Sequence, residues 1–240
     1  MNPLFEELDF RNTPMGELVL RRRRMMALKG KIIYEVKLND EYLMSSLFYA
    51  AEAALAETGL SCLEGGNWDV AVGGLGLGYT AAAALEFEQV KRLVVIEALA
   101  PVIDWHRQNL VPNGAVLCHD PRCQLIHGDF FALCRAGGLD PDTPGRQFDA
   151  ILIDIDHSPE AWLDAGHGEF YTAAGLNRLQ SLLKPGGVFA LWSNDAPHDG
   201  FIQTLSAVFE QAEGRTICFD NPLQQTVSEN GIYLARRKTG

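Results

Sequence analysis

Short apolar runs separated by amphipathic stretches make up most of the chain from Trp68 onward. The runs span residues 70–72, 93–96, 124–126, 150–153, 188–192, 217–219 and 232–235. Candidate helices, or loops long enough to cross over a sheet, separate the first five runs. Strands connected in this way lie parallel and are buried on both faces. The pattern therefore predicts an α/β fold with a mostly parallel sheet and helices on both of its faces.

The N-terminal residues show a period of two, which predicts a β-hairpin over residues 18–38. Its second strand places Ile32, Tyr34, Val36 and Leu38 on one face and Glu35, Lys37 and Asn39 on the other. The turn is expected at residues 29–31. A hairpin of this size is not stable alone and offers open sheet edges, so we expect it to pair with its counterpart in a homodimer.

A helix is expected after the hairpin, because apolar residues recur there at helical spacing. Ser45 or Ser46 is its expected cap, and Gly59 is expected to end it. We therefore divide the chain into an N-terminal β-hairpin segment, residues 1–45, and a Rossmann-like domain, residues 46–240.

The chain has a formal net charge of −11. Proteins that bind duplex nucleic acid usually carry an excess of Lys and Arg, so we expect no nucleic-acid partner. No stretch approaches the roughly 20 apolar residues that a membrane-spanning helix needs, and no secretory signal opens the chain. The five cysteines are odd in number and scattered, as in proteins of a reducing compartment. These features predict a cytoplasmic protein with no membrane partner.

A run of four arginines, residues 21–24, is the one concentrated basic segment of the chain. Such a run is either a solvated strand face or a contact for an acidic partner or a phosphate group. The sequence leaves both interpretations open.

A second cluster invites a zinc site, because Cys118, His119, Cys123 and His127 lie close along the sequence. Their spacing is not that of a tetrahedral zinc motif, and His127 falls on an expected strand. We therefore interpret these cysteines as loop and core thiols and expect no metal.

A glycine-rich turn follows the first strand of the predicted parallel sheet and precedes a helix expected over residues 79–85. Glycines at such a turn permit a positive φ and allow a ligand to approach the backbone closely. The helix N-terminus presents free N–H groups at the same place. Gly74, Gly76 and Gly78 are therefore candidate nucleoside-binding residues, although tight turns also use glycine without binding anything. The absence of a Gly-Lys-Ser/Thr sequence excludes a P-loop.

Acidic residues end the next two predicted strands. Glu97 follows the strand at 93–96, about 20 residues beyond the glycines, where an acid can accept hydrogen bonds from ribose hydroxyls. Asp129 follows the strand at 124–126, and a carboxylate there can accept from the exocyclic amine of adenine. Each acid taken singly also fits a solvated residue at a strand end. Because ligands bind outside the carboxyl ends of such strands, the three successive strand ends together predict a nucleoside site.

Three further segments resemble class I S-adenosylmethionine-dependent transferases, and among them the spermidine synthase family. Thr13-Pro14-Met15-Gly16-Glu17-Leu18-Val19-Leu20 is similar to that family's N-terminal β segment. Residues 148–154, Phe-Asp-Ala-Ile-Leu-Ile-Asp, and 183–188, Leu-Lys-Pro-Gly-Gly-Val, resemble its fourth-strand motif and the turn into its fifth strand. The resemblance implies a Rossmann-like methyltransferase fold and a homodimer. It also implies a donor that is S-adenosylmethionine or its decarboxylated form, with Glu97 on the ribose and Asp129 on the adenine.

The fourth strand ends in Asp154-Ile155-Asp156-His157, the candidate acceptor site. Alkyl transfer from a sulfonium needs a neutral nucleophile, whereas a free alkyl amine has a pKa of about 10.4 and is protonated at neutral pH. A carboxylate at the strand end can bind the ammonium and accept its proton. By the resemblance Asp154 corresponds to the family's catalytic aspartate, and Asp156 is the second candidate catalytic residue. The alternative for each is a residue that caps the next segment.

The chain departs from the family's pattern around this site. Gly76 stands where spermidine synthases have an acid, and the sequences Leu43-Met44-Ser45-Ser46 and Tyr49-Ala50-Ala51-Glu52 replace a glutamine and a Tyr-His-Glu motif. Loss of the loop acid removes a repulsion that a carboxylate-bearing donor would otherwise feel. Gly76 therefore favours ordinary S-adenosylmethionine and methyl transfer, whereas the family resemblance favours aminopropyl transfer from the decarboxylated donor.

Two functional hypotheses remain open at this point. In the first, the chain is an enzyme that transfers an alkyl group from a sulfonium donor to a small-molecule acceptor, expected to be an amine. In the second, it is a catalytically silent ligand-binding or interaction protein that keeps the fold. Aromatic residues at 162, 170 and 171 are either part of a lid over the ligand or ordinary packing.

Overall fold

The seven strands expected from the apolar runs all form in the computed structural model, which describes residues 4–239. They are β5 (Trp68–Gly73), β6 (Val90–Glu97), β7 (Cys123–His127), β8 (Phe148–Ile153), β9 (Leu183–Ser193), β10 (Gln211–Asn221) and β11 (Thr226–Arg236). They form one sheet in the order β10-β11-β9-β8-β5-β6-β7. Strands β5 to β9 are parallel, and β11 and β10 are added antiparallel at one edge. Residues 1–3 and 240, the outer ends of the two predicted domains, lie outside the described residues.

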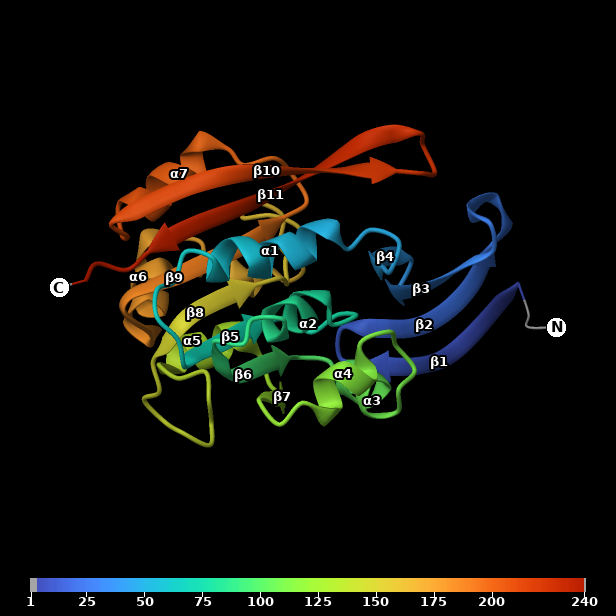
Figure 1. The fold of residues 1–240 in the computed structure, drawn as a ribbon, viewed down its shortest axis with the longest axis horizontal. Helices are drawn as coiled ribbons and strands as arrows, with labels where there is room; N and C mark the ends of the chain where they lie inside the picture. The colour runs from blue at the N-terminus through green and yellow to red at the C-terminus, as the bar shows by residue number, and fades with distance from the viewer. Residues whose placement is uncertain (1–3, 240) are drawn as a thin grey trace.

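Helices cover both faces of this sheet, as the sequence predicts (Figure 1). The helices are α1 (Ala50–Leu60), α2 (Tyr79–Leu85), α3 (Ala100–Arg107), α4 (Gly114–His119), α5 (Phe130–Ala136), α6 (Ala173–Leu182) and α7 (Asp199–Ser206). Helices α1 to α4 pack in the cluster that contains Val70 and Val72, whereas α5 to α7 pack in the cluster that contains Ala71. Alternate side chains of β5 thus enter opposite layers, as in a strand buried on both faces. No helix in residues 4–239 has the length and apolar character needed to cross a membrane.

The N-terminal residues form a second, antiparallel sheet in the order β1-β2-β3-β4. Its strands are β1 (Phe5–Thr13), β2 (Gly16–Met25), β3 (Lys31–Leu38) and β4 (Glu41–Ser45), with a short 3₁₀ helix, η1 (Met26–Leu28), in the turn. The predicted hairpin is confirmed as β2 and β3, but its edges are not open, because β1 and β4 pair with them on either side. Leu18, Leu20 and Val36 join this sheet to the core beneath α1 and α2.

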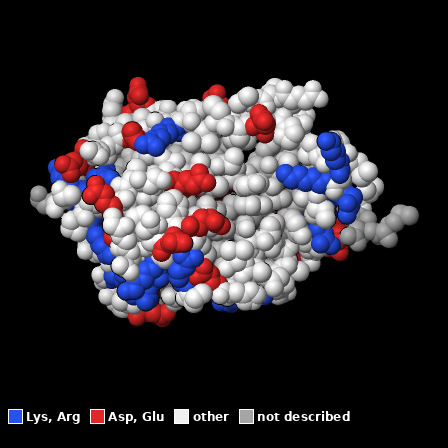
Figure 2. Space-filling model, in the orientation of Figure 1, with Lys and Arg blue, Asp and Glu red and all other residues white. Residues whose placement is uncertain are grey.

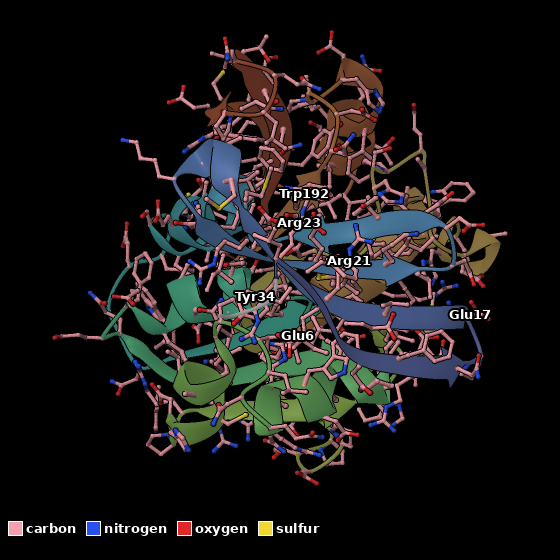
Figure 3. The ribbon with its side chains drawn as sticks, turned by 90° about the vertical axis from the view of Figure 1, so that its right-hand side faces the viewer. Glu6, Glu17, Arg21, Arg23, Tyr34 and Trp192 are labelled. Carbon is pink, nitrogen blue, oxygen red and sulfur yellow. The ribbon has the colours of Figure 1, made fainter. Side chains whose placement is uncertain are left out.

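The face of β3 that carries Glu35 contains ion pairs with the neighbouring strand β2. Glu35 is only 3% exposed, and its carboxylate lies 2.9 Å from Arg21 and 2.8 Å from Arg23. Figure 3 shows both arginines near the middle of this end of the molecule. Arg22, on the opposite face of β2, pairs with Glu6. The period of two placed Glu35 on the face opposite Val36 but could not show its burial, because it cannot tell a solvated face from one whose charges are paired. The basic run is therefore engaged within its own sheet.

Helix α1 begins four residues later than its expected caps. The hydroxyl of Ser46 accepts from the backbone N–H of Tyr34 at 2.8 Å, and that of Ser45 accepts from Leu47. Both serines therefore hold the end of the N-terminal sheet and not the helix. Gly59 lies inside α1, where an added Cβ would come within 2.8 Å of Leu152. The glycine lets α1 pack closely on β8 and β9, where an added Cβ would also lie 3.3 Å from Ala190.

Lys and Arg side chains are divided into separate groups on the face shown in Figure 2. Wide uncharged areas and acidic side chains lie between these groups. A continuous basic surface, the usual electrostatic feature of a nucleic-acid-binding domain, is not seen on this face.

Candidate active site

A cavity of about 730 Å³ opens at the carboxyl ends of β5, β6 and β8, where ligands bind in sheets of this kind. The N-terminal sheet and the ribbon of β10 and β11 supply its remaining walls. The cavity is lined by the predicted site residues Gly74, Gly76, Gly78, Glu97, Asp129 and Asp154. One predicted residue, Asp156, is not part of the lining.

The glycine turn fits between the ends of two neighbouring strands. The backbone N–H of Gly74 donates to the carbonyl of Ile96 at 2.9 Å, and that of Asp154 donates to Gly73 at 2.8 Å. Gly74 has a φ of +91°, and an added Cβ would lie 2.0 Å from the carbonyl oxygen of Asp154. Only glycine fits this position, because both the backbone conformation and the close approach exclude a side chain.

Glu97, the last residue of β6, holds the glycine turn in place through hydrogen bonds to its carboxylate. Its Oε2 accepts from the backbone N–H of Leu75 at 3.0 Å, and its Oε1 accepts from Leu99 at 2.8 Å. Burial raises the pKa of the Glu97 carboxyl, and the backbone N–H donors act in the opposite direction. A carboxylate has about four lone-pair positions, so two bonds leave capacity for ribose hydroxyls. The ribose role of Glu97 stays a prediction.

One carboxylate oxygen of Asp129 caps a helix, and the other is available to a ligand. Its Oδ1 accepts from the backbone N–H of Ala132 at 3.0 Å and so caps α5. The residue also lines the cavity. Contact with the adenine amine stays a prediction for the other oxygen, Oδ2.

Two acids of the cavity lining, Glu52 and Asp154, lie close enough to influence each other, and Thr80 contacts both residues. The Oγ1 of Thr80 lies 2.9 Å from Oδ2 of Asp154 and 3.1 Å from the backbone carbonyl of Glu52. Burial, together with the charge of Asp154, raises the pKa of Glu52 to about 8. Burial raises the pKa of Asp154 to about 6, against the lowering effect of the Thr80 hydrogen bond. Such a pair can hold a proton or, in its place, an ammonium group.

Sequence reasoning missed Glu52, which it treated as part of a departure from the family's helix motif. A usable signal was present in the sequence. Glu52 precedes Leu55, Ala56 and Gly59 by three, four and seven residues, and all three are buried. A charged residue on the buried stripe of a helix is a candidate functional group, because burying it unpaired is costly.

Asp156 lies outside the cavity, in the segment that follows β8. It is 1% exposed and accepts hydrogen bonds from Nδ1 of His167 at 2.9 Å, the hydroxyl of Tyr171 at 2.8 Å and the N–H of Leu163 at 2.8 Å. This placement argues against direct contact between Asp156 and an acceptor. The sequence placed the two aspartates together because they are two residues apart, but the chain turns between them.

The aromatic residues proposed for a lid divide between two environments. Phe170 and Tyr171 are buried in the core cluster of α5 to α7, so they pack the fold. Trp162 is 41% exposed. The lining from this segment comes instead from His157, Leu163, His167 and their neighbours.

The sequence model of the spermine/spermidine synthase domain matches residues 52–228, which include the glycine turn and all the strand-end acids of the cavity. The chain belongs to the spermine/spermidine synthase family. Polyamine aminopropyltransferase 2 of Pseudomonas aeruginosa is 31% identical over 150 residues, which cover 60% of this chain and 40% of that protein. Polyamine aminopropyltransferase of Corynebacterium efficiens is 30% identical over 174 residues, or 72% of this chain and 29% of that protein. The chain thus spans less than half the length of these curated relatives.

Solved spermidine synthase structures share the fold of this family member. One, in complex with the transition state analogue AdoDATO, superposes with a TM-score of 0.73 at 17% identity and covers 98% of this chain and 74% of that one. The enzyme from Thermotoga maritima gives a TM-score of 0.71 with the same identity and coverage. The likeness confirms the expected Rossmann-like methyltransferase fold.

The main departure from the spermidine synthase pattern, Gly76, has a neighbour that the sequence did not indicate. A Cβ at Gly76 would lie 2.9 Å from Sδ of Met44 and 3.3 Å from its Cε. The thioether therefore fills the space in which a side chain of the loop would stand. Met44 comes from β4, so the N-terminal sheet helps to shape the donor side of the cavity.

The cysteines lie as the sequence analysis expected. Cys134 is buried, Cys123 is half-buried, and Cys118 is exposed, each as a free thiol. Burial raises the pKa of the Cys123 thiol to about 12, which keeps it protonated. Within residues 4–239, no three His, Cys, Asp or Glu side chains gather in a way that suits a metal ion.

Proposed function

We propose that this chain transfers an aminopropyl group from decarboxylated S-adenosylmethionine to an amine. The observation that carries the proposal is the half-buried pair of Glu52 and Asp154 beside the glycine turn, in which burial raises the pKa of both carboxyls. Two carboxyls in one buried site are unfavourable unless a proton or a cation lies between them. An ammonium group of a substrate is the cation that the proposed reaction brings. Family membership supports the same reaction.

The proposed step is a displacement at carbon. Asp154 takes the proton of the acceptor's ammonium group, the neutral amine then attacks the methylene carbon of the aminopropyl group, and the bond from that carbon to the sulfonium breaks. Methylthioadenosine leaves as a neutral thioether, the product leaves as a secondary ammonium, and Asp154 returns the acceptor's proton to solvent. With its pKa near 6, Asp154 is mostly ionised at neutral pH and able to accept that proton.

The surroundings of the glycine turn support the decarboxylated donor over ordinary S-adenosylmethionine. Asp154, the member of the pair that is mostly ionised at neutral pH, supplies the negative charge that Gly76 lacks and would repel a donor carboxylate. Arg135, the one Arg or Lys side chain that lines the cavity in residues 4–239, lies on α5 with Asp129, away from this turn. Met44 also occupies the space beside Gly76. Gly76 favours methyl transfer only when the glycine turn is taken alone, because α1 and β8 contribute acids to the same part of the cavity.

The test is to incubate the protein with each donor and a panel of mono-, di- and polyamines and to identify the nucleoside product. Methylthioadenosine from the decarboxylated donor is the expected product. Glu52→Gln and Asp154→Asn should each lower the rate by at least about 100-fold. Glu57→Gln, an exposed carboxyl on the same helix, is the matched control and should leave the rate unchanged.

Two outcomes would contradict the proposal. S-adenosylhomocysteine as the product would identify methyl transfer, the reaction that Gly76 favoured in the sequence. Nucleoside binding without turnover of any amine in the panel would favour the silent ligand-binding protein.

A further inference from the structure

His167 occupies a fixed position in the wall of the cavity, near the expected adenine end. Its ring stacks on Phe131, with centroids 4.0 Å apart and planes at 30°. Phe131 follows Asp129 by two residues at the start of α5, and all three residues line the cavity. The side chain of His167 is 14% exposed. The imidazole therefore lines the same cavity as the acid that is expected to meet the adenine amine, and it is fixed against the helix that this acid caps.

Asp156 determines which ring nitrogen of His167 carries the proton. Nδ1 lies 2.9 Å and 3.1 Å from the two oxygens of Asp156. An ionised carboxylate only accepts hydrogen bonds, so Nδ1 must donate. In the neutral imidazole the other nitrogen, Nε2, is then an acceptor. Among residues 4–239, the hydrogen bonds of the His167 ring are made by Nδ1, which leaves Nε2 available to a ligand.

We propose that His167 reads the nucleobase of the donor, with Nε2 accepting a hydrogen bond from the exocyclic amine of adenine. The inference rests on the proposed function, since it needs an adenosine donor in this cavity. The amine has two N–H groups, and the site offers two acceptors for them, Oδ2 of Asp129 and Nε2 of His167. A 6-oxo purine would present an oxygen to both acceptors and would be rejected. Asp156 acts as a positioning residue, since it sets the tautomer of His167.

The experiment measures binding of methylthioadenosine and of methylthioinosine, its 6-oxo counterpart, by calorimetry on the full chain. The native protein should prefer methylthioadenosine. His167→Ala should weaken methylthioadenosine roughly tenfold, the effect of one hydrogen bond, and bind methylthioinosine at least as well as before. His167→Gln, whose amide oxygen can still accept, should restore part of the preference. The control is His119→Ala, at an exposed position on α4 outside the cavity lining.

Asp156→Asn supplies a readout that a purely structural role would not change. The amide can donate to Nδ1, which makes Nε2 the N–H of the ring and turns it into a donor. The preference should then shift toward methylthioinosine, in a variant shown by its thermal transition to be folded. If that variant does not fold, the two His167 variants decide the question alone.

Equal weakening of both nucleosides in His167→Ala would show that the ring only packs the wall, and would overturn the inference. The inference would also be overturned if the ratio of the affinities for methylthioadenosine and methylthioinosine were the same in His167→Ala as in the native protein. In either case binding of methylthioadenosine to the native protein would leave the proposed function standing. A native protein that binds neither nucleoside would instead overturn the proposed function together with the inference.

Discussion

The hydroxyl of Thr80 lies 2.9 Å from Oδ2 of Asp154 and joins the helix after the glycine turn to the end of β8. This contact lowers the pKa of an acid that burial otherwise raises. The same hydroxyl lies 3.1 Å from the backbone carbonyl of Glu52 on α1. Thr80 therefore contacts the carboxyl of Asp154 and the backbone of Glu52, the two acids that line this part of the cavity.

Replacement of Thr80 by Val should make Asp154 harder to ionise. Transfer needs the ionised form, so the rising limb of the pH–rate profile should move to higher pH. At pH 6 we expect the rate to fall about threefold, since loss of one hydrogen bond of about 1 kcal/mol leaves less of Asp154 ionised there, with little change at pH 8. Thr204→Val removes a hydroxyl that bonds only a carbonyl at the start of α7 and serves as the control. Superimposable profiles for Thr80→Val and the native protein would contradict this role.

The raised pKa of Glu52 should make stability fall as the pH rises. A carboxyl whose pKa is 4.5 when unfolded and about 8 when folded binds more protons in the folded state between these values. Its contribution is complete below pH 4.5 and is lost as the pH rises through 8. The slope from one such group reaches about 1.4 kcal/mol per pH unit. Denaturant titrations from pH 5 to 9 should show a shallower fall for Glu52→Gln than for Glu57→Gln, and equal slopes would refute the assignment.

The expected contact between Glu97 and the ribose is tested by comparing a ligand that contains the ribose with adenine alone. Glu97→Ala should weaken methylthioadenosine by about 1–3 kcal/mol through lost charge-assisted hydrogen bonds. Binding of adenine alone should change much less, because the base is expected to lie nearer Asp129. The control variant is Glu86→Gln, which changes an exposed acid at the end of α2. Unchanged calorimetric affinity for methylthioadenosine in a folded Glu97→Ala variant would rule out the ribose contact.

Donor preference at Gly76 should depend on Met44. An aspartate placed there by Gly76→Asp would meet Sδ of Met44 at a φ of +50°, so the single variant should lose stability. Adding Met44→Ala should recover part of the loss. In the double variant, binding of S-adenosylmethionine should weaken tens-fold while the decarboxylated donor is spared. Equal affinity changes for the two donors would show that no donor amine or carboxylate approaches this position.

The homodimer stays a prediction, but the strands that could form its interface are not the ones expected from the sequence. The hairpin of β2 and β3 is enclosed by β1 and β4, so only these outer strands offer edges. Phe5 and Phe10 on β1 and Tyr42 on β4 are exposed apolar side chains at those strands. Light scattering at micromolar concentration should give twice the 26.4 kDa of one chain. A monomer would contradict the expectation.

The sequence by itself determined the parallel sheet and the edge at which its ligand site lies. Apolar runs report burial on both faces directly, because every side chain of such a strand is inside. Glu97, Asp129 and Asp154 were found for a related reason. Each directly follows or nearly follows a strand, and the carboxyl ends of parallel strands meet at one edge whatever the rest of the chain does.

Only the tertiary structure decided which charged residues are buried and what they meet. Glu35 meets arginines of the adjacent strand, Glu52 meets an acid about 100 residues away, and Asp156 turns away from Asp154 toward His167. A periodic pattern records the face of its own element and carries no information about the partner on another. The pKa of a carboxyl depends on that partner and on the water that packing excludes, and both exist only when distant segments come together.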